Sequence, residues 1–220
     1  MTSTDALLVS GGARFGDPWH PFADTSAALT EILQKRGYGV TVCEDADAGL
    51  ALLASTPPPA LLVVNIGWFG PERFSEPATA GLVAALQSGV PTLLVHSTLT
   101  AFPEWPLWQE IAGGGWTYGT TYHPAYGPAV ALAKPDHPLT AGLDRLAIVD
   151  ERYTKLWVDD QAGVFLEHEE GGRRHPLAWT RAWGRSPIVA DALGHDSDSY
   201  RAGGRTTLLQ LELDWLQSQV

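Results

Sequence analysis

Val90-Pro91-Thr92-Leu93-Leu94-Val95-His96-Ser97-Thr98 is the stretch of sequence that decides the fold. Its centre, residues 92–96, is predicted to be a buried strand that ends on a histidine. A short apolar run bounded by Gly89 and Pro91 is typical of a strand in a parallel sheet. Ligands of open parallel sheets bind just beyond the carboxyl ends of the strands. The pattern therefore places His96 at a candidate ligand-binding edge.

The chain before this stretch alternates predicted strands and helices. Apolar runs predict strands at residues 6–10, 40–43 and 61–65, and the segments between them predict helices around 28–33, over 46–54 and over 78–87. Such alternation is the pattern of a doubly wound parallel sheet. We therefore expect an α/β fold for the first 100 residues.

The alternation is weaker after residue 100. We expect short strands at 130–134, 147–149 and 188–193, a pair of strands at 163–166 and 177–183 joined by the charged hairpin 167–174, and a terminal helix over 206–216. No linker, repeat or low-complexity segment separates this part from the first. The prediction is a single domain over residues 1–220.

Composition limits the class of partner. The chain has 220 residues, 45% of them hydrophobic, and a net charge of −11 without a basic stripe, which argues against nucleic acid and anionic membranes. No run reaches the ~18 apolar residues of a membrane span. The start, Met1–Asp5, is polar and does not suit a signal peptide, and the one cysteine, Cys43, fits the cytosol. We expect a cytoplasmic protein with a small-molecule partner. The sequence does not fix the oligomeric state, and a homo-oligomer is one option.

Four motifs occur in an order that resembles the trehalose-utilisation, or ThuA-like, family. They are His-Pro-Leu-Thr-Ala-Gly-Leu (137–143), Asp-Glu-Arg-Tyr (150–153), Pro-Leu-Ala-Trp (176–179) and Leu-Gly-His-Asp (193–196). The family also has a strand ending in histidine like His96, a glycine loop followed by a histidine like His123, and a terminal helix with a tryptophan like Trp215. The resemblance covers nearly the whole chain. It implies the fold of class I glutamine amidotransferases, a flavodoxin-like three-layer α/β sandwich with a mainly parallel sheet.

Cysteine-dependent glutaminase chemistry is excluded by the residues present. Glutamine amidotransferases carry a nucleophilic cysteine at the elbow after the strand that corresponds to residues 92–96. Here the elbow, Leu94–Thr98, contains no cysteine, and Cys43 belongs to the second predicted strand, where a core position is expected. Ser97 is an alternative nucleophile, but Gly-x-Ser-x-Gly is absent and a serine there also suits a helix cap.

Histidines and one carboxylate recur at predicted strand ends. Because strand-end loops of a doubly wound sheet meet at one edge, we expect these side chains to converge. We predict as catalytic residues His96, Glu151 and His195, and as substrate-binding residues His20, Trp68, His123 and Tyr153. Neutral imidazole also binds metals, so a divalent metal is a candidate cofactor, although no tight spacing such as HExxH is present.

The remaining histidines and the loop aromatics have simpler interpretations. His137, before Pro138, is predicted to be a turn or N-cap residue, and His168 and His175 are expected at the surface beside the charged hairpin. Flat aromatic faces pack on sugar rings. Candidate walls of a sugar cleft, in loops above the same sheet edge, are Trp19, Trp68, Trp116 and Tyr122.

The resemblance implies a role in the use of trehalose and related disaccharides. In that setting a partner dehydrogenase oxidises the 3-hydroxyl, and ThuA-like proteins act on the keto-sugar. A keto group acidifies the neighbouring C–H, so a base with a metal or a hydrogen-bond donor suffices for isomerisation, epimerisation or elimination. We therefore expect a carbohydrate-active enzyme that works by acid–base chemistry. The alternatives are a non-catalytic module that binds a sugar or another small ligand, and a serine hydrolase that uses Ser97.

Overall fold

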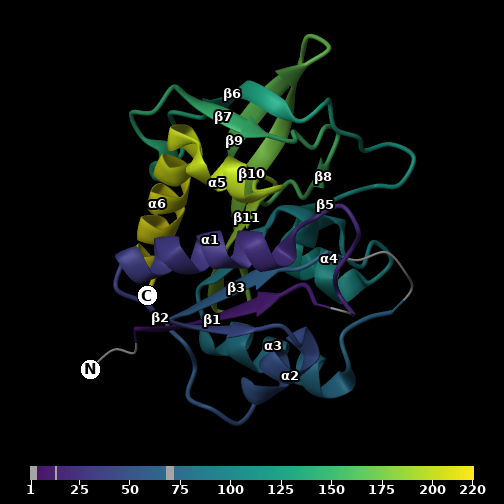
Figure 1. Ribbon diagram of the computed structural model, residues 1–220, viewed down its shortest axis with the longest axis vertical. Helices are drawn as coiled ribbons and strands as arrows, with labels where there is room; N and C mark the ends of the chain where they lie inside the picture. The colour runs from purple at the N-terminus through teal and green to yellow at the C-terminus, as the bar shows by residue number, and fades with distance from the viewer. Residues whose placement is uncertain (1–3, 13, 68–71) are drawn as a thin grey trace.

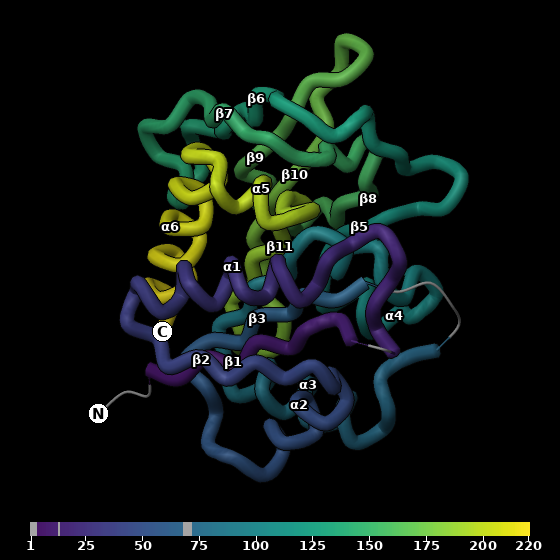
Figure 2. The backbone as a smooth tube through the Cα atoms, viewed as in Figure 1, coloured from purple at the N-terminus to yellow at the C-terminus, as the bar shows by residue number. Residues whose placement is uncertain are grey.

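The computed structural model describes residues 4–12, 14–67 and 72–220 (Figures 1 and 2). Its strands are β1 (Asp5–Ser10), β2 (Gly39–Cys43), β3 (Leu61–Asn65), β4 (Thr92–Val95), β5 (Gly114–Gly115), β6 (Gly127–Ala133), β7 (Arg145–Asp150), β8 (Trp157–Val158), β9 (Gly163–Glu170), β10 (Arg173–Trp183) and β11 (Ser186–Asp191). Its helices are α1 (Phe22–Lys35), α2 (Ala46–Leu52), α3 (Glu76–Ser88), α4 (Pro106–Ala112), α5 (Ser197–Arg201) and α6 (Gly203–Ser218), with 3₁₀ turns η1 (His96–Thr100) and η2 (Pro138–Thr140).

The large sheet is parallel in one half and antiparallel in the other. Its strand order is β2-β1-β3-β4-β11-β10-β9-β6-β7. Neighbours from β2 to β11 pair in parallel, and neighbours from β11 to β7 pair antiparallel. β4 lies between β3 and β11, and all four of its residues are buried, as its apolar run predicts. The predicted α/β fold is confirmed, and the prediction of a mainly parallel sheet describes its first half.

Helices cover both faces of the parallel half and give the three layers. Figure 1 shows α2 and α3 on one side of the sheet and α1 with α6 on the other. The hydrophobic core divides in the same way. One cluster contains Leu50 of α2 and Leu82 of α3, and the other contains Leu29 of α1 and Leu209 of α6.

Local sequence signals set the helix ends. The side chain of Asp45 accepts a hydrogen bond from the backbone N–H of Ala48 and caps α2, and Ser75 caps α3 in the same way. α3 ends at Gly89, whose φ of 98° favours glycine. α3 is therefore longer than the predicted helix over 78–87, because its polar first and last turns carry no apolar signal, whereas α2 ends two residues before the predicted 46–54.

The charged hairpin at 167–174 is shorter than expected. β9 runs to Glu170 and β10 begins at Arg173, so the turn is only Gly171-Gly172, both with positive φ. The added strand residues pair His168 with His175. The prediction that His168 lies at the surface is wrong, because the segment 152–154 covers its ring and leaves it buried; His175 is half-buried.

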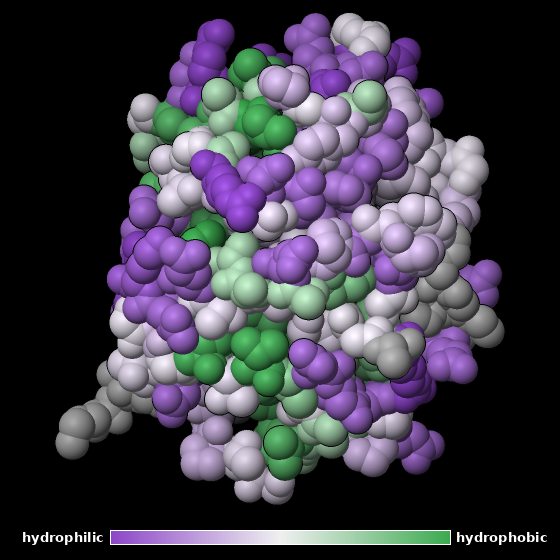
Figure 3. Space-filling view, in the orientation of Figure 1, coloured by the Kyte–Doolittle hydropathy of each residue, from purple (hydrophilic) through white to green (hydrophobic). Residues whose placement is uncertain are grey.

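The visible surface is mostly polar. On the face shown in Figure 3, hydrophilic side chains dominate and hydrophobic ones surface in separate patches. Within the described ranges, no helix is both long and apolar enough to cross a bilayer. The apolar sides of α1 and α6 pack against the sheet instead.

Candidate active site

His96 occupies the elbow directly after β4. Its φ is 47°, in the left-handed region, which costs a non-glycine residue about 1–2 kcal/mol. The elbow turns the chain into η1 and leaves His96 only 1% exposed at the carboxyl edge of the sheet. The structure therefore has a histidine at the edge where the apolar run predicts one, held in a strained conformation of the kind found at functional sites.

The hydrogen bonds of His96 fix the proton on its ring. Nδ1 is 2.7 Å from the Ala192 carbonyl oxygen, which only accepts, so Nδ1 carries the hydrogen and Nε2 presents a lone pair. The Tyr153 hydroxyl donates to this Nε2 at 3.0 Å. Burial, reinforced by the neighbouring His20 ring, holds the pKa of His96 well below its ordinary value. His96 is therefore a neutral imidazole at pH 7.

The loop after β1 delivers His20 together with an acidic partner, Asp17. Asp17 Oδ1 accepts the backbone N–H groups of Trp19 and His20 at 2.9 and 3.0 Å. The two carboxylate oxygens lie 2.7 and 2.8 Å from Nδ1 of His20. Burial alone would raise the pKa of Asp17, but the hydrogen bond and charge of His20 lower it overall. An ionised Asp17 keeps a proton on Nδ1 and leaves Nε2 of His20 facing His96.

Glu151 follows β7 and lies among three histidines. Its Oε2 is 3.3 Å from Nδ1 of His195 and 3.7 Å from Nε2 of His96, and its Oε1 is 3.5 Å from Nδ1 of His123. Burial acts to raise the pKa of Glu151, but His195 and His123 lower it overall. Conversely, burial acts to lower the pKa of His195, but Glu151 raises it overall. The carboxylate is therefore ionised within the cluster.

The histidine cluster consists of His20, His96, Glu151 and His195. Each offers one ligand atom, and these four atoms lie within 4.8 Å of one another. Nε2 of His20 is 3.1 Å from Nε2 of His96. With both Nδ1 atoms protonated, two lone pairs face each other, which is favourable only with a proton or a cation between them. Nδ1 of His195 is buried and faces Oε2 of Glu151 at 3.3 Å.

This donor set fits a divalent transition metal. Imidazole nitrogens and a carboxylate oxygen are the ligands that Zn²⁺ and related ions take. Two nitrogens at about 2.1 Å from a tetrahedral Zn²⁺ are roughly 3.4 Å apart, close to the separation of the two Nε2 atoms. Asp17 and the Ala192 carbonyl hold the far nitrogens of His20 and His96, as outer partners of metal-bound histidines commonly do.

Asp150 ties the two carboxyl-terminal elements of the cluster together. Its Oδ2 accepts the backbone N–H of Gly194 at 2.7 Å, and its Oδ1 accepts that of His195 at 3.1 Å. The same Oδ1 also accepts the N–H of Glu151. Burial raises the pKa of Asp150 to about 7, against the opposing effects of Arg205 and of these N–H groups. One carboxyl group thus sets the position of His195 relative to Glu151.

Arg205 of α6 holds the same turn from the other side. It is fully buried and donates to the Leu193 carbonyl at 3.2 Å. Its guanidinium lies 2.6 Å from Asp191, at the end of β11. Because this turn supplies both His195 and the Ala192 carbonyl, the buried pair positions two of the four side chains of the cluster.

Two predicted binding residues lie beside the cluster. Tyr153 is buried, and its ring stacks on that of His96 with centroids 4.6 Å apart. The His123 side chain is 39% exposed, and its ring centroid is 6.2 Å from that of Tyr153. Trp116 packs edge-on against Tyr153 at 5.0 Å and is half-buried. The predicted binding residue Trp68 lies outside the described residues.

The other predicted wall residues are exposed. Trp19, next to His20 in sequence, is 56% exposed, and Tyr122 is 41% exposed. The Lys155 ammonium lies 5.5 Å from the ring of Tyr122. The backbones of Tyr122 and Thr154 pair in an isolated bridge, which ties this loop to the segment that carries Tyr153.

The side chains outside the cluster have structural partners. The Ser97 hydroxyl is buried and donates to the Ile66 carbonyl at 2.9 Å, which commits its proton to the backbone. Cys43 is half-buried, and its thiol donates to the Asp45 carbonyl. His137 caps η2 by accepting the Leu139 N–H, as predicted.

Three contributors to the site were not predicted from the sequence: Asp17, Asp150 and Tyr126. An Asp-Pro turn directly before His20 could have indicated Asp17, because aspartate oxygens accept backbone N–H groups two or three residues on. Asp150 stands in the Asp-Glu-Arg-Tyr motif directly before the predicted Glu151. Tyr126 hydrogen-bonds to Asp196, 70 residues away, so no local pattern indicates it.

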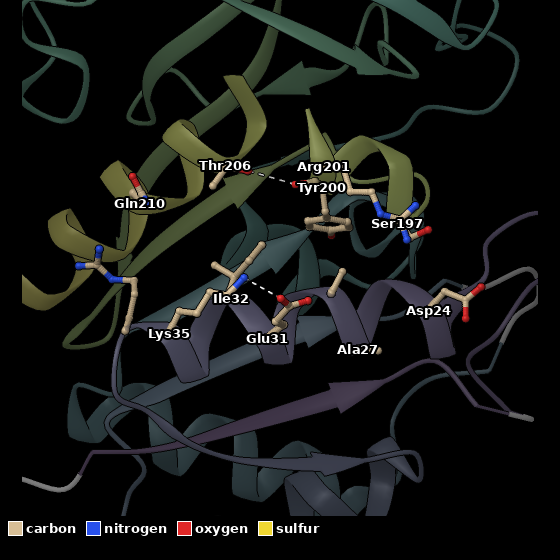
Figure 4. A pocket seen from close by; sticks show the side chains of 12 residues that line it. Asp24, Ala27, Glu31, Ile32, Lys35, Ser197, Tyr200, Arg201, Thr206 and Gln210 are labelled. Carbon is tan, nitrogen blue, oxygen red and sulfur yellow. Dashed lines mark hydrogen bonds and ion pairs between the residues drawn. The ribbon is translucent and has the colours of Figure 1, made fainter. Parts of the chain in front are cut away.

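A separate groove of about 770 Å³ runs between α1 and the α5–α6 segment (Figure 4). Asp24 and Glu31 line it from α1, Arg201 from α5 and Gln210 from α6. Figure 4 shows Lys35 extended toward Glu31, and their Nζ and Oε1 atoms are 2.6 Å apart. No residue of the histidine cluster lines this groove, so it is not part of the candidate active site.

Comparison with known proteins gives a family and a fold. A family model described as "ThuA: Trehalose utilisation" matches residues 6–216. A ThuA-like protein from Parabacteroides merdae ATCC 43184 is 18% identical with a TM-score of 0.80, covering 99% of this chain and 91% of that chain. A ThuA-like protein from Bacteroides uniformis ATCC 8492 is 13% identical with a TM-score of 0.74, covering 98% and 92%. A glutamine amidotransferase from Thermotoga maritima is 12% identical with a TM-score of 0.53, covering 98% and 84%. No match was found among curated proteins.

Proposed function

Because the chain belongs to the trehalose-utilisation (ThuA) family, we propose that it acts on a keto-sugar derived from trehalose or a related disaccharide, by acid–base chemistry at the histidine cluster. The observation that carries the proposal is the convergence of His20, His96, Glu151 and His195 within 4.8 Å at the carboxyl edge of the sheet. Four distant segments supply these side chains, and hydrogen bonds to Asp17 and to the Ala192 carbonyl fix the orientation of His20 and His96. Such an arrangement is costly for stability alone and suits a ligand-binding centre.

In this proposal the four side chains of the cluster hold a divalent metal. The lone pairs on Nε2 of His20 and His96, the buried Nδ1 of His195 and the ionised Glu151 are the available ligands. When bound, the metal supplies a Lewis acid that polarises the keto oxygen and lowers the pKa of the adjacent C–H. His96, Glu151 and His195 then serve catalysis as ligands, which refines their predicted role.

Two residues next to the cluster, His123 and Tyr153, are the candidates for proton transfer. His123 Nδ1 is 3.0 Å from the Pro124 carbonyl oxygen and donates to it, so Nε2 keeps a lone pair at the exposed side of the site. We assign to this nitrogen the removal of the proton from the carbon beside the keto group. The electron pair of that C–H bond forms a C=C bond, and the negative charge moves to the former keto oxygen. The Tyr153 hydroxyl is neutral because burial raises its pKa. A metal on Nε2 of His96 would take the lone pair to which this hydroxyl donates, and we assign the freed hydroxyl as donor to that oxygen.

The direct test is exchange of the acidic C–H in heavy water. NMR follows loss of the proton signal of 3-keto-trehalose with wild type, with His195→Ala and with His175→Ala, a matched control on β10 outside the cluster. We expect exchange in wild type and in the control, and loss of at least a hundredfold in His195→Ala together with loss of bound metal by elemental analysis. Binding of the sugar without exchange in wild type would support a binding module instead of an enzyme. Equal exchange in all three proteins would remove the site assignment.

A further inference from the structure

Tyr126 places a fixed, exposed aromatic ring beside the histidine cluster. The residue is 38% exposed, and its ring centroid is 5.5 Å from that of His195. Its hydroxyl donates to Asp196 Oδ1 at 2.9 Å. Asp196 in turn accepts the backbone N–H of Ser199 and caps α5, so the acceptor itself is held in place. The Tyr126 ring is therefore held by its polar end, while more than a third of the residue stays exposed to solvent.

The segment Tyr122–Tyr126, here called the rim, is anchored at both ends. At its start, Tyr122 exchanges two backbone hydrogen bonds with Thr154, at 3.1 and 2.7 Å. At its end, Tyr126 is bonded to Asp196 and is followed directly by β6. Pro124 restricts the backbone between them. A rim tied to the segment of Tyr153 on one side and to the turn of His195 on the other is preorganised for a ligand.

Exposure of side chains increases from the cluster toward the rim. The His96 side chain is 1% exposed, that of Glu151 12% and that of His195 19%. His123 and Tyr126, both in the rim, are 39% and 38% exposed. A ligand whose reacting part lies at the buried cluster therefore extends outward past the rim.

We propose that the face of Tyr126 is a second sugar subsite, on which the ring that does not react stacks. The inference rests on the proposed function and names its substrate class: a disaccharide, or a glycoside whose second unit is a ring, in preference to a simple methyl glycoside. The flat face of a tyrosine matches the apolar face of a pyranose, and a held ring loses little entropy on binding. Tyr126 is thus a specificity-determining residue.

The experiment compares two sugars that share the reacting ring. Calorimetry measures Kd for 3-keto-trehalose and for methyl 3-keto-α-glucoside, which lacks the second ring, with wild type, Tyr126→Ala and Val130→Ala. Val130 is an exposed apolar residue on β6 and serves as the matched control. We expect Tyr126→Ala to weaken binding of the disaccharide about tenfold and to leave that of the methyl glycoside within twofold. Tyr126→Phe, which keeps the ring, should recover most of the loss.

The other possible results distinguish failure of the second subsite from failure of the proposed function. If wild type binds both sugars equally well, or Tyr126→Ala weakens both by the same factor, the second subsite is wrong while the proposed function stands. If wild type binds neither sugar at millimolar concentration, the proposed function fails and the subsite fails with it. Binding of the disaccharide that is equally weak in Tyr126→Phe and Tyr126→Ala would mean that the ring is not what the sugar contacts.

Discussion

Two buried histidines, His96 in the parallel half of the sheet and His168 in the antiparallel half, have equal burial and different surroundings. They are 1% and 0% exposed, and burial lowers the pKa of both, that of His168 to about 4. Nε2 of His168 lies 3.3 Å from both the Thr154 hydroxyl and the Tyr153 carbonyl. Nε2 of His96 instead faces His20, Tyr153 and Glu151.

The difference shows that burial of a histidine does not by itself indicate a functional site. The partners of His168 lie within 16 residues of it along the chain, and they tie a hairpin to its neighbouring loop. The partners of His96 lie up to 96 residues away, and its second nitrogen points at other ligand atoms. What distinguishes His96 is that its Nε2 faces the ligand atoms of His20 and Glu151. Nε2 of His168 instead contacts its neighbouring loop.

The largest expected effect comes from removing each histidine in turn. Loss of an outer partner of a metal typically lowers affinity 10–100-fold, so loss of the direct ligand in His96→Ala should lower it about a thousandfold or more. His168→Ala should keep the metal and lose stability instead. Elemental analysis after dialysis measures the metal content of each variant, and competition with a chelator measures its metal affinity. Equal metal content in the two variants would remove the distinction drawn between the two histidines.

The next effect tests how the turn that carries His195 is held. Arg205→Ala leaves the buried carboxylate of Asp191 without its cation, so we expect the free energy of unfolding to fall by about 3–5 kcal/mol in urea titrations. The matched control is Arg201→Ala on α5, whose pair with Asp198 is exposed, and it should cost less than about 1 kcal/mol. Similar losses for the two arginines would show that the buried pair does not clamp the turn.

The parallel half of the fold was readable from sequence because its signals are local. A short apolar run ending on His96 gives both the central strand and the position of its edge, and Asp45, Ser75 and Gly89 mark helix ends within a few residues. The convergence of His20, His96, Glu151 and His195 follows from one topological rule about strand ends. The sequence could therefore predict which residues belong to the cluster, but not the distances between them.

What the sequence could not give depends on contacts between distant segments. His168 was expected at the surface because charged neighbours surround it, yet the loop at Arg152–Thr154 folds over it. Arg205 and Glu212 lie on a helix with the spacing of an ordinary polar face, and only the tertiary fold buries them against Asp191. Tyr126 reaches Asp196 across 70 residues. No periodicity encodes such pairings.

A smaller effect tests the orientation of His20. In Asp17→Asn the amide replaces an ionised carboxylate at Nδ1, so His20 loses a charged acceptor that fixes its tautomer. We expect metal affinity to fall about 10–100-fold with little change in the midpoint of unfolding of the metal-free protein. A chelator titration at constant pH measures the affinity. Unchanged affinity would mean that Nε2 of His20 is not a ligand.

The smallest effect concerns the pH dependence of stability at His168. Its pKa is about 4 in the folded protein and about 6.5 when unfolded, so between these values the unfolded chain binds a proton that the folded chain does not. Stability from this group is fully present above pH 6.5 and is lost as the pH falls toward 4. We expect the gap in free energy of unfolding between wild type and His168→Gln to shrink by about 1–2 kcal/mol over this range. A constant gap would mean that the imidazole is solvated despite its burial, and the contrast with His96 would then rest on the metal measurements alone.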